Sequence, residues 1–176
     1  MVFRKLVEKI FIVVEDAYAP YALERILKRY NVDISKIEIR HLMICSSKMA
    51  RIVKGHIKAG NHVIIIVDAE YESSREKEQW VRQKHGLCDQ VDIIVVDPCI
   101  EAIACEALGL RGCRDKPCDN GPLRAINIYW HRKYGKDYDK RFLASLMLEA
   151  DREGCLGSVP EFNMLLRIVR ARILRS

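Results

Sequence analysis

The sequence lacks several features that mark common classes of protein. Its apolar runs, such as IFIVV at 10–14, are too short to span a membrane, and the N-terminus has no small-residue cleavage pattern. We therefore expect a cytoplasmic protein with no signal peptide and no membrane partner. No glycine-rich loop follows residues 10–14, because YAPY at 18–21 stands where GxGxxG or a P-loop would be. This disfavours a nucleotide-binding protein of the Rossmann type.

The cysteines include no CxxC pair and lack the spacing of a zinc knuckle, although the chain has seven of them. We interpret most as small buried side chains. Rich use of Ile, Val, Arg and Lys hints at a thermophile, in which intracellular disulfides do occur. On that basis the first disulfide to expect joins Cys113 to Cys118.

The positive charge is unevenly distributed along the chain. Residues 1–110 hold 16 basic and 16 acidic side chains, whereas residues 111–176 hold 14 basic and 8 acidic ones, so the excess of +6 lies entirely in the last third. Clustered Lys and Arg gain affinity for phosphates by displacing counterions, so nucleic acid is the partner we expect. The alternative is a solvated helix face. A homodimer also remains open.

Four short apolar runs rich in β-branched residues predict four strands separated by helices. The runs are residues 10–14, 37–44, 62–67 and 91–96. The first and third are almost continuously apolar, as expected for parallel strands that helices cover on both faces, whereas the second alternates and should lie nearer an edge. The sequence therefore predicts an α/β, Rossmann-like domain with a four-stranded, mainly parallel sheet.

Capping signals place helices between and after these strands. Ser46 or Ser47 can cap the second helix, and Ser73 with Glu76 forms a capping box for the third. After Gly109 we expect a loop and three further helices. They are expected around residues 123–133, 139–150 and 160–174, the last capped by Ser158. We treat residues 1–110 as the α/β domain and residues 111–176 as a basic helical extension packed on it.

Acidic residues follow the ends of three predicted strands. Glu15 follows the first, Asp68 and Glu70 follow the third, and Asp97 follows the fourth. Ligands of an open parallel sheet bind beyond the carboxyl ends of its strands. Asp68 and Glu70 lie two residues apart in a segment expected to be extended, so both should face one ion, joined by Glu15 if the first and third strands are neighbours. These oxygen donors suit Mg²⁺ or Mn²⁺.

Several acidic residues also have purely structural interpretations. Asp68 and Asp97 could cap the helix that follows each strand, which is the reading we prefer for Asp97. Asp16 is either a further ligand or a helix cap. Glu101 either extends the acidic site or is an ordinary first-turn acid favoured by the helix dipole.

Basic residues in the last third of the chain are candidates for phosphate binding. Lys136, Lys140 and Arg141 would hold a phosphate against the metal site if the helical extension folds back over the strand ends. Otherwise they are surface charges. We interpret Trp130, with Tyr129, as a core residue rather than a base-stacking platform.

These motifs resemble a known fold. A glutamate after the first strand, in IFIVVED, and an acidic pair after the third, in IIIVDAE, resemble the Toprim fold of topoisomerases, primases and overcoming-lysogenization-defect nucleases. The segments DPCIEAIACEALGL, YGKDYDKR and SVPEFNMLLRIV resemble the C-terminal part of small stand-alone Toprim-like proteins. The resemblance spans nearly the whole chain.

The resemblance implies a metal-dependent nuclease-like hydrolase that acts on nucleic-acid phosphodiesters. Glu15 would act near the reacting phosphate as general acid/base or ligand, and Asp68 and Glu70 would hold magnesium. The chain departs from the family pattern in having Asp-x-Glu rather than Asp-x-Asp, and Asp16 where a glycine commonly follows the first glutamate. A misplacement of about 1 Å is enough to slow catalysis steeply. The alternative is therefore a non-catalytic module that binds nucleic acid or protein on the same scaffold.

Overall fold

The computed structural model describes residues 9–87 and 89–174. Part of the N-terminal segment in which we expected no signal peptide, residues 1–8, and one of the seven cysteines, Cys88, lie outside the described residues. None of the helices within the described ranges combines the length and the apolar character needed to cross a bilayer.

A four-stranded, all-parallel sheet forms the centre of the molecule. Its strands are β1 (Ile10–Val14), β2 (Ile37–His41), β3 (His62–Asp68) and β4 (Val91–Val96). Their order is β2-β1-β3-β4, so β1 and β3 are neighbours and β2 lies at an edge, as its alternating pattern predicts. The α/β, Rossmann-like prediction is confirmed.

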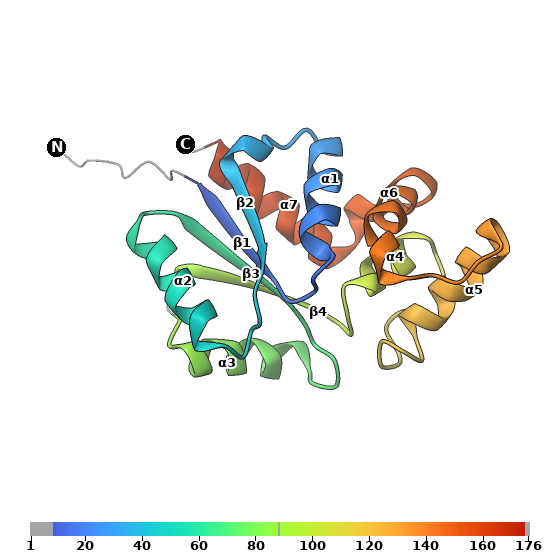
Figure 1. The fold of residues 1–176 in the computed structure, drawn as a ribbon, viewed down its shortest axis with the longest axis horizontal. Coiled ribbons are helices and arrows are strands. Elements are labelled where there is room, and N and C mark those ends of the chain that lie inside the picture. Colours follow the sequence, from blue (N-terminus) through green and yellow to red (C-terminus); the bar gives the residue numbers. More distant parts are fainter. Residues whose placement is uncertain (1–8, 88, 175–176) are drawn as a thin grey trace.

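Helices cover both faces of the sheet (Figure 1). The helices are α1 (Ala19–Arg29), α2 (Ser47–Lys58), α3 (Ser74–His85), α4 (Glu101–Ala107), α5 (Pro122–Tyr134), α6 (Leu143–Glu153) and α7 (Pro160–Ile173). Short 3-10 turns are η1 (Ile34–Lys36), η2 (Lys140–Phe142) and η3 (Leu156–Ser158). In Figure 1, α1 and α7 lie on one side of the sheet and α2 and α3 on the other, while α4, α5 and α6 gather beyond the strand ends.

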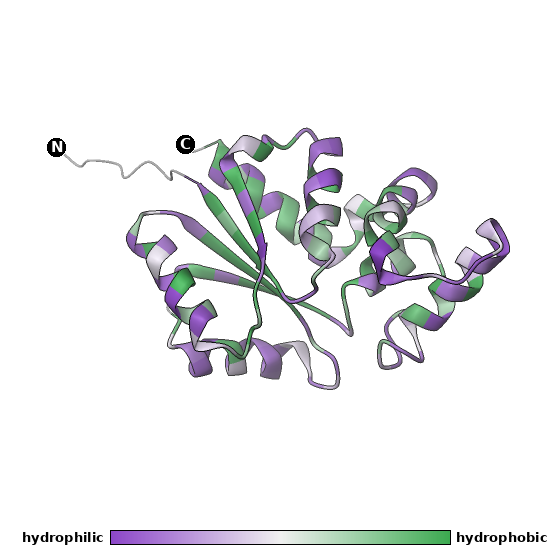
Figure 2. Ribbon diagram, viewed as in Figure 1, coloured by the Kyte–Doolittle hydropathy of each residue, from purple (hydrophilic) through white to green (hydrophobic). Residues whose placement is uncertain are grey.

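The core has two layers because successive residues of each strand point to opposite faces. Ile10, Ile12 and Val14 of β1 belong to the larger cluster, which includes residues of α1, α4, α5, α6 and α7. Phe11 and Val13 belong to the smaller cluster, under α2 and α3. Figure 2 shows the strands as almost uniformly hydrophobic ribbons among helices with hydrophilic outer faces. The helices after residue 110 therefore pack on the same core as the sheet.

The helix boundaries follow most of the capping signals. The Ser46 side chain caps α2, and Ser73 and Glu76 form the predicted capping box of α3. The prediction that Ser158 caps the last helix is wrong, because Val159 is the N-cap of α7 and the Ser158 hydroxyl instead donates to the backbone oxygen of Cys155. A 3-10 turn immediately before α7 takes Ser158 away from the capping position.

Candidate functional site

The ends of β1 and β3 bring two acidic residues together. Val14 pairs in register with Ile66, so the residues after β1 lie level with the last residues of β3. The backbone N–H of Asp68 donates to Glu15 Oε2 at 3.2 Å. This bond orients the Glu15 carboxylate across the strand ends, where ligands of parallel sheets bind.

Asp68 is the most strongly perturbed acid of this group. Burial raises the pKa of its carboxyl well above the usual value, and the charges of Glu101, Glu15 and Asp16 raise it further. The residue keeps some solvent contact, but protein atoms crowd round the carboxyl group. We call Glu15, Asp16, Asp68 and Glu101 the acidic cluster. A group of like charges that must share a buried space favours either protonation or a bound cation.

Asp16 belongs to the turn that leads into α1. Its Oδ1 accepts a hydrogen bond from the backbone N–H of Tyr18 at 2.7 Å, and its Oδ2 lies 3.4 Å from Lys140 Nζ. The N-cap of α1 is Tyr18, without a side-chain cap. Asp16 therefore forms an Asx-type turn before the helix rather than capping it, and its second oxygen faces Lys140.

Glu101 is the first residue of α4 and is fully buried. Its Oε1 accepts no hydrogen bond from the described residues, and Lys140 Nζ lies 3.5 Å away. Burial raises the pKa of Glu101, and the Lys140 charge only partly opposes this. A first-turn acid that served only the helix dipole would be expected in solvent, so the burial of Glu101 needs a second explanation.

Lys140, in η2, supplies the cation nearest to the acidic cluster. Burial by itself lowers the pKa of Lys140, but the charges of Glu101 and Asp16 outweigh it and the pKa rises. Its side chain is 43% exposed, so one side faces solvent while the other faces the carboxylates. Lys140 therefore brings this part of the helical extension over the strand ends, as a phosphate-binding role for Lys140 requires.

Three of the predicted site residues lie apart from this cluster in their observed contacts. Glu70 is exposed and has a left-handed backbone, with φ of 59°. Because β3 ends at Asp68, the segment is not extended at Glu70, and the expectation that alternate residues point the same way does not apply. Lys136 lies over the Phe142 ring, and Arg141 pairs with Asp139 at 2.9 Å on the surface.

A capping role was one interpretation of the strand-end acids Asp68 and Asp97, and neither residue has it. The N-cap of α3 is Ser73 and that of α4 is Ile100, so neither Asp68 nor Asp97 caps the helix that follows it. The Asp97 backbone oxygen instead accepts a hydrogen bond from Arg114. The preferred reading of Asp97 as a cap is therefore wrong, because the turn after β4 places Pro98 and Cys99 between it and the first turn of α4.

Tyr138 is a site residue that the sequence did not single out. Its hydroxyl is buried without a hydrogen-bond partner among the described residues. Burial raises the pKa of Tyr138, as do the charges of Glu101 and Asp16, which places its hydroxyl within electrostatic reach of the acidic cluster. The segment YGKDYDKR contains it, but no spacing rule distinguishes this tyrosine from Tyr134 four residues earlier.

The structure has two disulfides, Cys99–Cys118 and Cys105–Cys113. The expected Cys113–Cys118 pair is wrong, because the loop after α4 places each of these residues against a cysteine near the start or middle of that helix. The interpretation of most cysteines as small buried side chains holds for three of the six described ones, Cys99, Cys105 and Cys113, whereas Cys118 is half-buried and Cys45 and Cys155 are exposed. Trp130, by contrast, is a core residue as predicted.

Basic side chains line a hollow of about 820 Å³ between α1 and α6. Its charged and aromatic lining comprises the bases Arg25, Lys28, Arg29 and Arg152, the acids Glu24 and Glu149, and the aromatic residues Tyr21 and Tyr134. Three of these bases take part in ion pairs on the surface, among them Lys28 with Glu24 at 2.7 Å. We call this hollow the basic groove. Much of its charge comes from α1, so basic residues from both ends of the chain meet here.

Comparison of the sequence with protein-family models, with curated proteins and with solved structures yields no match. The fold and the residue contacts are therefore the basis for any statement about function.

Proposed function

We propose that the protein is a Mg²⁺-dependent, Toprim-like enzyme that acts on nucleic-acid phosphodiesters by nuclease-like phosphoryl transfer. The acidic cluster at the carboxyl ends of β1 and β3 supports the proposal above all. There, Asp68 lies among three other carboxylates with one ammonium group beside them. Such an arrangement costs folding free energy, which is common where function rather than stability selects the residues.

The donor set fits magnesium in its chemistry. Every candidate ligand in the acidic cluster is a carboxylate oxygen, and Glu101 Oε1 has no hydrogen-bond donor among the described residues. Mg²⁺ keeps several waters and commonly needs only one or two carboxylates, so a wide cluster is no obstacle. Asp68 and Glu15 would hold the ion directly, and Asp16 and Glu101 would bind its waters, because no three carboxylates of the cluster have oxygens within 4.8 Å of one another among the described residues. When bound, the ion would polarise a phosphoryl oxygen and neutralise developing charge.

The chain's own residues would then position the substrate. Lys140 faces both solvent and the carboxylates, so it can contact a phosphate at the edge of the cluster. Glu15 is held by the Asp68 backbone and can exchange a proton near that phosphate. The basic groove would bind the rest of the nucleic-acid backbone, with Tyr21 and Tyr134 as stacking surfaces.

The second candidate is a non-catalytic module that binds nucleic acid or protein on the same scaffold. The position of Lys140 favours it, because an ammonium 3.4 Å from Asp16 and 3.5 Å from Glu101 can neutralise part of the cluster without any metal. In this case the acids and Lys140 form a structural charge network. The two candidates differ in what magnesium does to the protein.

Cleavage of labelled single- and double-stranded DNA and RNA, with Mg²⁺ or Mn²⁺, tests the proposal. We expect wild type to cleave, and the Glu15→Gln, Asp68→Asn double variant to lose both cleavage and magnesium affinity. Glu70→Gln is the matched control, because Glu70 is exposed and lies beyond the end of β3 with a left-handed backbone; it should keep both activities. If no substrate is cut and the double variant binds magnesium like wild type, the enzymatic proposal is wrong.

Binding at low salt tests the nucleic-acid partner separately. Each phosphate contact changes the slope of log K against log[salt] by about 0.7–0.9. Replacing Arg25 and Arg152 by Ala should therefore weaken binding and reduce that slope by roughly one to two. Arg51→Ala is the control, because Arg51 is exposed on α2, across the sheet from the basic groove. An Arg51→Ala loss half as large as that of the double variant would assign binding to net charge alone.

A further inference from the structure

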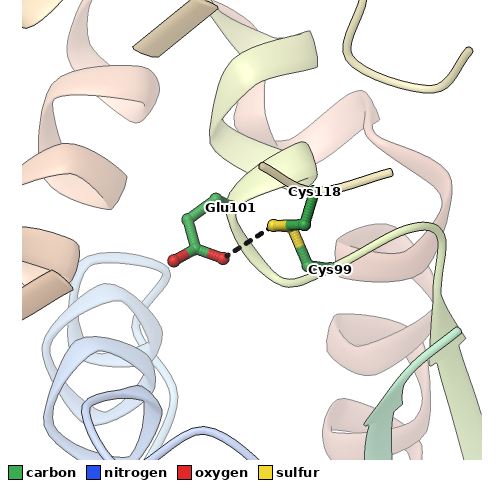
Figure 3. A group of neighbouring side chains, drawn as sticks. All are labelled: Cys99, Glu101 and Cys118. Atoms are coloured by element: carbon green, nitrogen blue, oxygen red, sulfur yellow. Dashed lines mark hydrogen bonds between the residues drawn. A yellow bond between two sulfur atoms is a disulfide. The ribbon is translucent and has the colours of Figure 1, made fainter. Parts of the chain in front are cut away.

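Three potential metal ligands converge beside the acidic cluster but are not all carboxylates. The Sγ atoms of Cys99 and Cys118 and a carboxylate oxygen of Glu101 lie within 4.8 Å of one another. Among residues 9–87 and 89–174 this is the one group of three or more His, Cys, Asp or Glu residues that meets this spacing. Figure 3 shows the carboxylate of Glu101 pointing at the disulfide that joins the two cysteines.

The Glu101 carboxylate has one oxygen near Lys140 and the other facing this disulfide. Its Oε2 lies 3.9 Å from Cys118 Sγ, the contact drawn as a dashed line in Figure 3. A disulfide sulfur carries no hydrogen, so in the oxidised protein this contact is not a hydrogen bond. Glu101 is 0% exposed, and although Lys140 Nζ lies 3.5 Å from Oε1, its Oε2 faces a disulfide that cannot donate to it. Lys140 offsets only part of the cost of burying this carboxylate, and a state in which Oε2 binds a cation would remove more of it.

We propose that the reduced protein binds a thiophilic divalent cation, of which Zn²⁺ is the type, through Cys99, Cys118 and Glu101. A dithiol reductant would deliver two electrons and two protons to the Cys99–Cys118 bond, giving two thiols and the reductant's own disulfide. The cation then displaces the two thiol protons and binds both thiolates. Two sulfurs and one oxygen leave a fourth tetrahedral position for water.

The disulfide and the metal therefore exclude each other at this position. The same two sulfur atoms are either bonded to one another or bonded to the cation, so the redox state decides whether the site exists. Cys118 is only partly buried, which gives the reductant and the cation a way in. This site differs in chemistry from the magnesium site proposed above, because thiolates select soft metals and carboxylates select hard ones.

The second disulfide provides an internal control. Cys105 and Cys113 are both buried and bonded to each other, but they belong to no group of three potential ligands among the residues that the structure describes. Reducing that bond should yield two thiols without a metal site. Cys45 and Cys155 are exposed and unpaired, so their background contribution has to be removed.

Titration of the phosphine-reduced full chain with Co²⁺ tests the proposal. The background variant replaces Cys45, Cys155 and Cys88, the last of which lies outside the described residues, by Ser. Reduced background protein should show thiolate-to-cobalt charge-transfer absorption that saturates at one equivalent and that Zn²⁺ abolishes by competition. Oxidised background protein should show none. The signal should disappear on adding Cys99→Ser with Cys118→Ser, and it should persist on adding Cys105→Ser with Cys113→Ser.

Glu101→Gln tests the third ligand. Loss of even an outer-shell partner costs about 10- to 100-fold in metal affinity, so this variant should lose at least about tenfold while keeping the charge-transfer signal. The proposal is overturned if the reduced background protein gives no such signal, if the Cys99, Cys118 variant keeps it, or if Glu101→Gln binds as tightly as the background protein. Magnesium-dependent cleavage is measured on the oxidised protein, so failure of one proposal leaves the other unaffected.

Discussion

Replacing Asp68 by Asn should stabilise the metal-free protein and remove its response to magnesium. The amide keeps the shape of the side chain but removes the charge that burial and the neighbouring acids destabilise. Substitutions that relieve such a site commonly add about 0.5–2 kcal/mol to the free energy of unfolding. For a chain of this length each kcal/mol raises Tm by about 2–4 °C. We expect Asp68→Asn to raise Tm of the metal-free protein by roughly 1–8 °C at pH 7.

The pH dependence of this gain has a definite sign. Folding raises the pKa of Asp68. At acid pH the side chain is protonated in both the folded and the unfolded state, so it costs no stability there. The cost appears as pH rises above the ordinary pKa of 3.8 and through the raised pKa. The Asn variant avoids that cost. Its advantage over wild type should therefore be present at pH 7 and vanish below about pH 4.

Magnesium should reverse the order of the two proteins. A ligand at 100 times its Kd stabilises a folded protein by about 2.7 kcal/mol, which corresponds to roughly 5–10 °C here. Wild type should show this increase and Asp68→Asn should not, while Glu70→Gln should behave as wild type. Thermal unfolding with EDTA and then with saturating Mg²⁺ measures both effects. A lower Tm for Asp68→Asn in EDTA, or an undiminished magnesium response, would refute the reasoning.

Three further predictions concern stability and are checked by denaturant unfolding. Replacing Cys105 and Cys113 by Ala should cost about 2–3 kcal/mol, as expected for the short loop that their disulfide closes. Gly154→Ala should lower the free energy of unfolding by at least about 2 kcal/mol, because the new Cβ would lie 1.9 Å from a backbone oxygen of α4. Gly55→Ala, in the open middle of α2, should instead raise the free energy of unfolding by about 0.5–1 kcal/mol. Glu149→Gln should cost about 2 kcal/mol at pH 7 and less as pH falls below 4.5.

The sign of the Glu149 prediction follows from its contacts. Burial by itself raises the pKa of Glu149, but hydrogen bonds from Lys133, Tyr129 and Tyr134 outweigh it and the pKa falls. The stability that these bonds provide is present above 4.5 and is lost as pH falls through the lowered pKa. A cost that stayed constant down to acid pH would contradict this account, as would equal effects of the two glycine substitutions.

The sequence predicted the elements of the fold well because the signals for them are local. Apolar runs at 10–14 and 91–96 match β1 and β4 residue for residue, and the Ser73–Glu76 capping box begins α3 as expected. The second strand ends at His41 rather than at residue 44, close to the point where its partner β1 ends at Val14. Strand length thus depends on the neighbouring strand as well as on the apolar pattern.

The acids themselves were visible in the sequence because they follow parallel strands, but only the tertiary structure decided which of them meet. Glu15 and Asp68 meet through strand pairing, whereas Asp16 meets Lys140 from 124 residues away. Glu70 itself has a left-handed backbone just after β3, so it does not continue the alternation of the strand, and no periodicity rule reveals such a turn. The disulfide partners were likewise decided by the path of the loop after α4. Periodicity and capping act over a few residues, while the meeting of side chains depends on how whole elements pack.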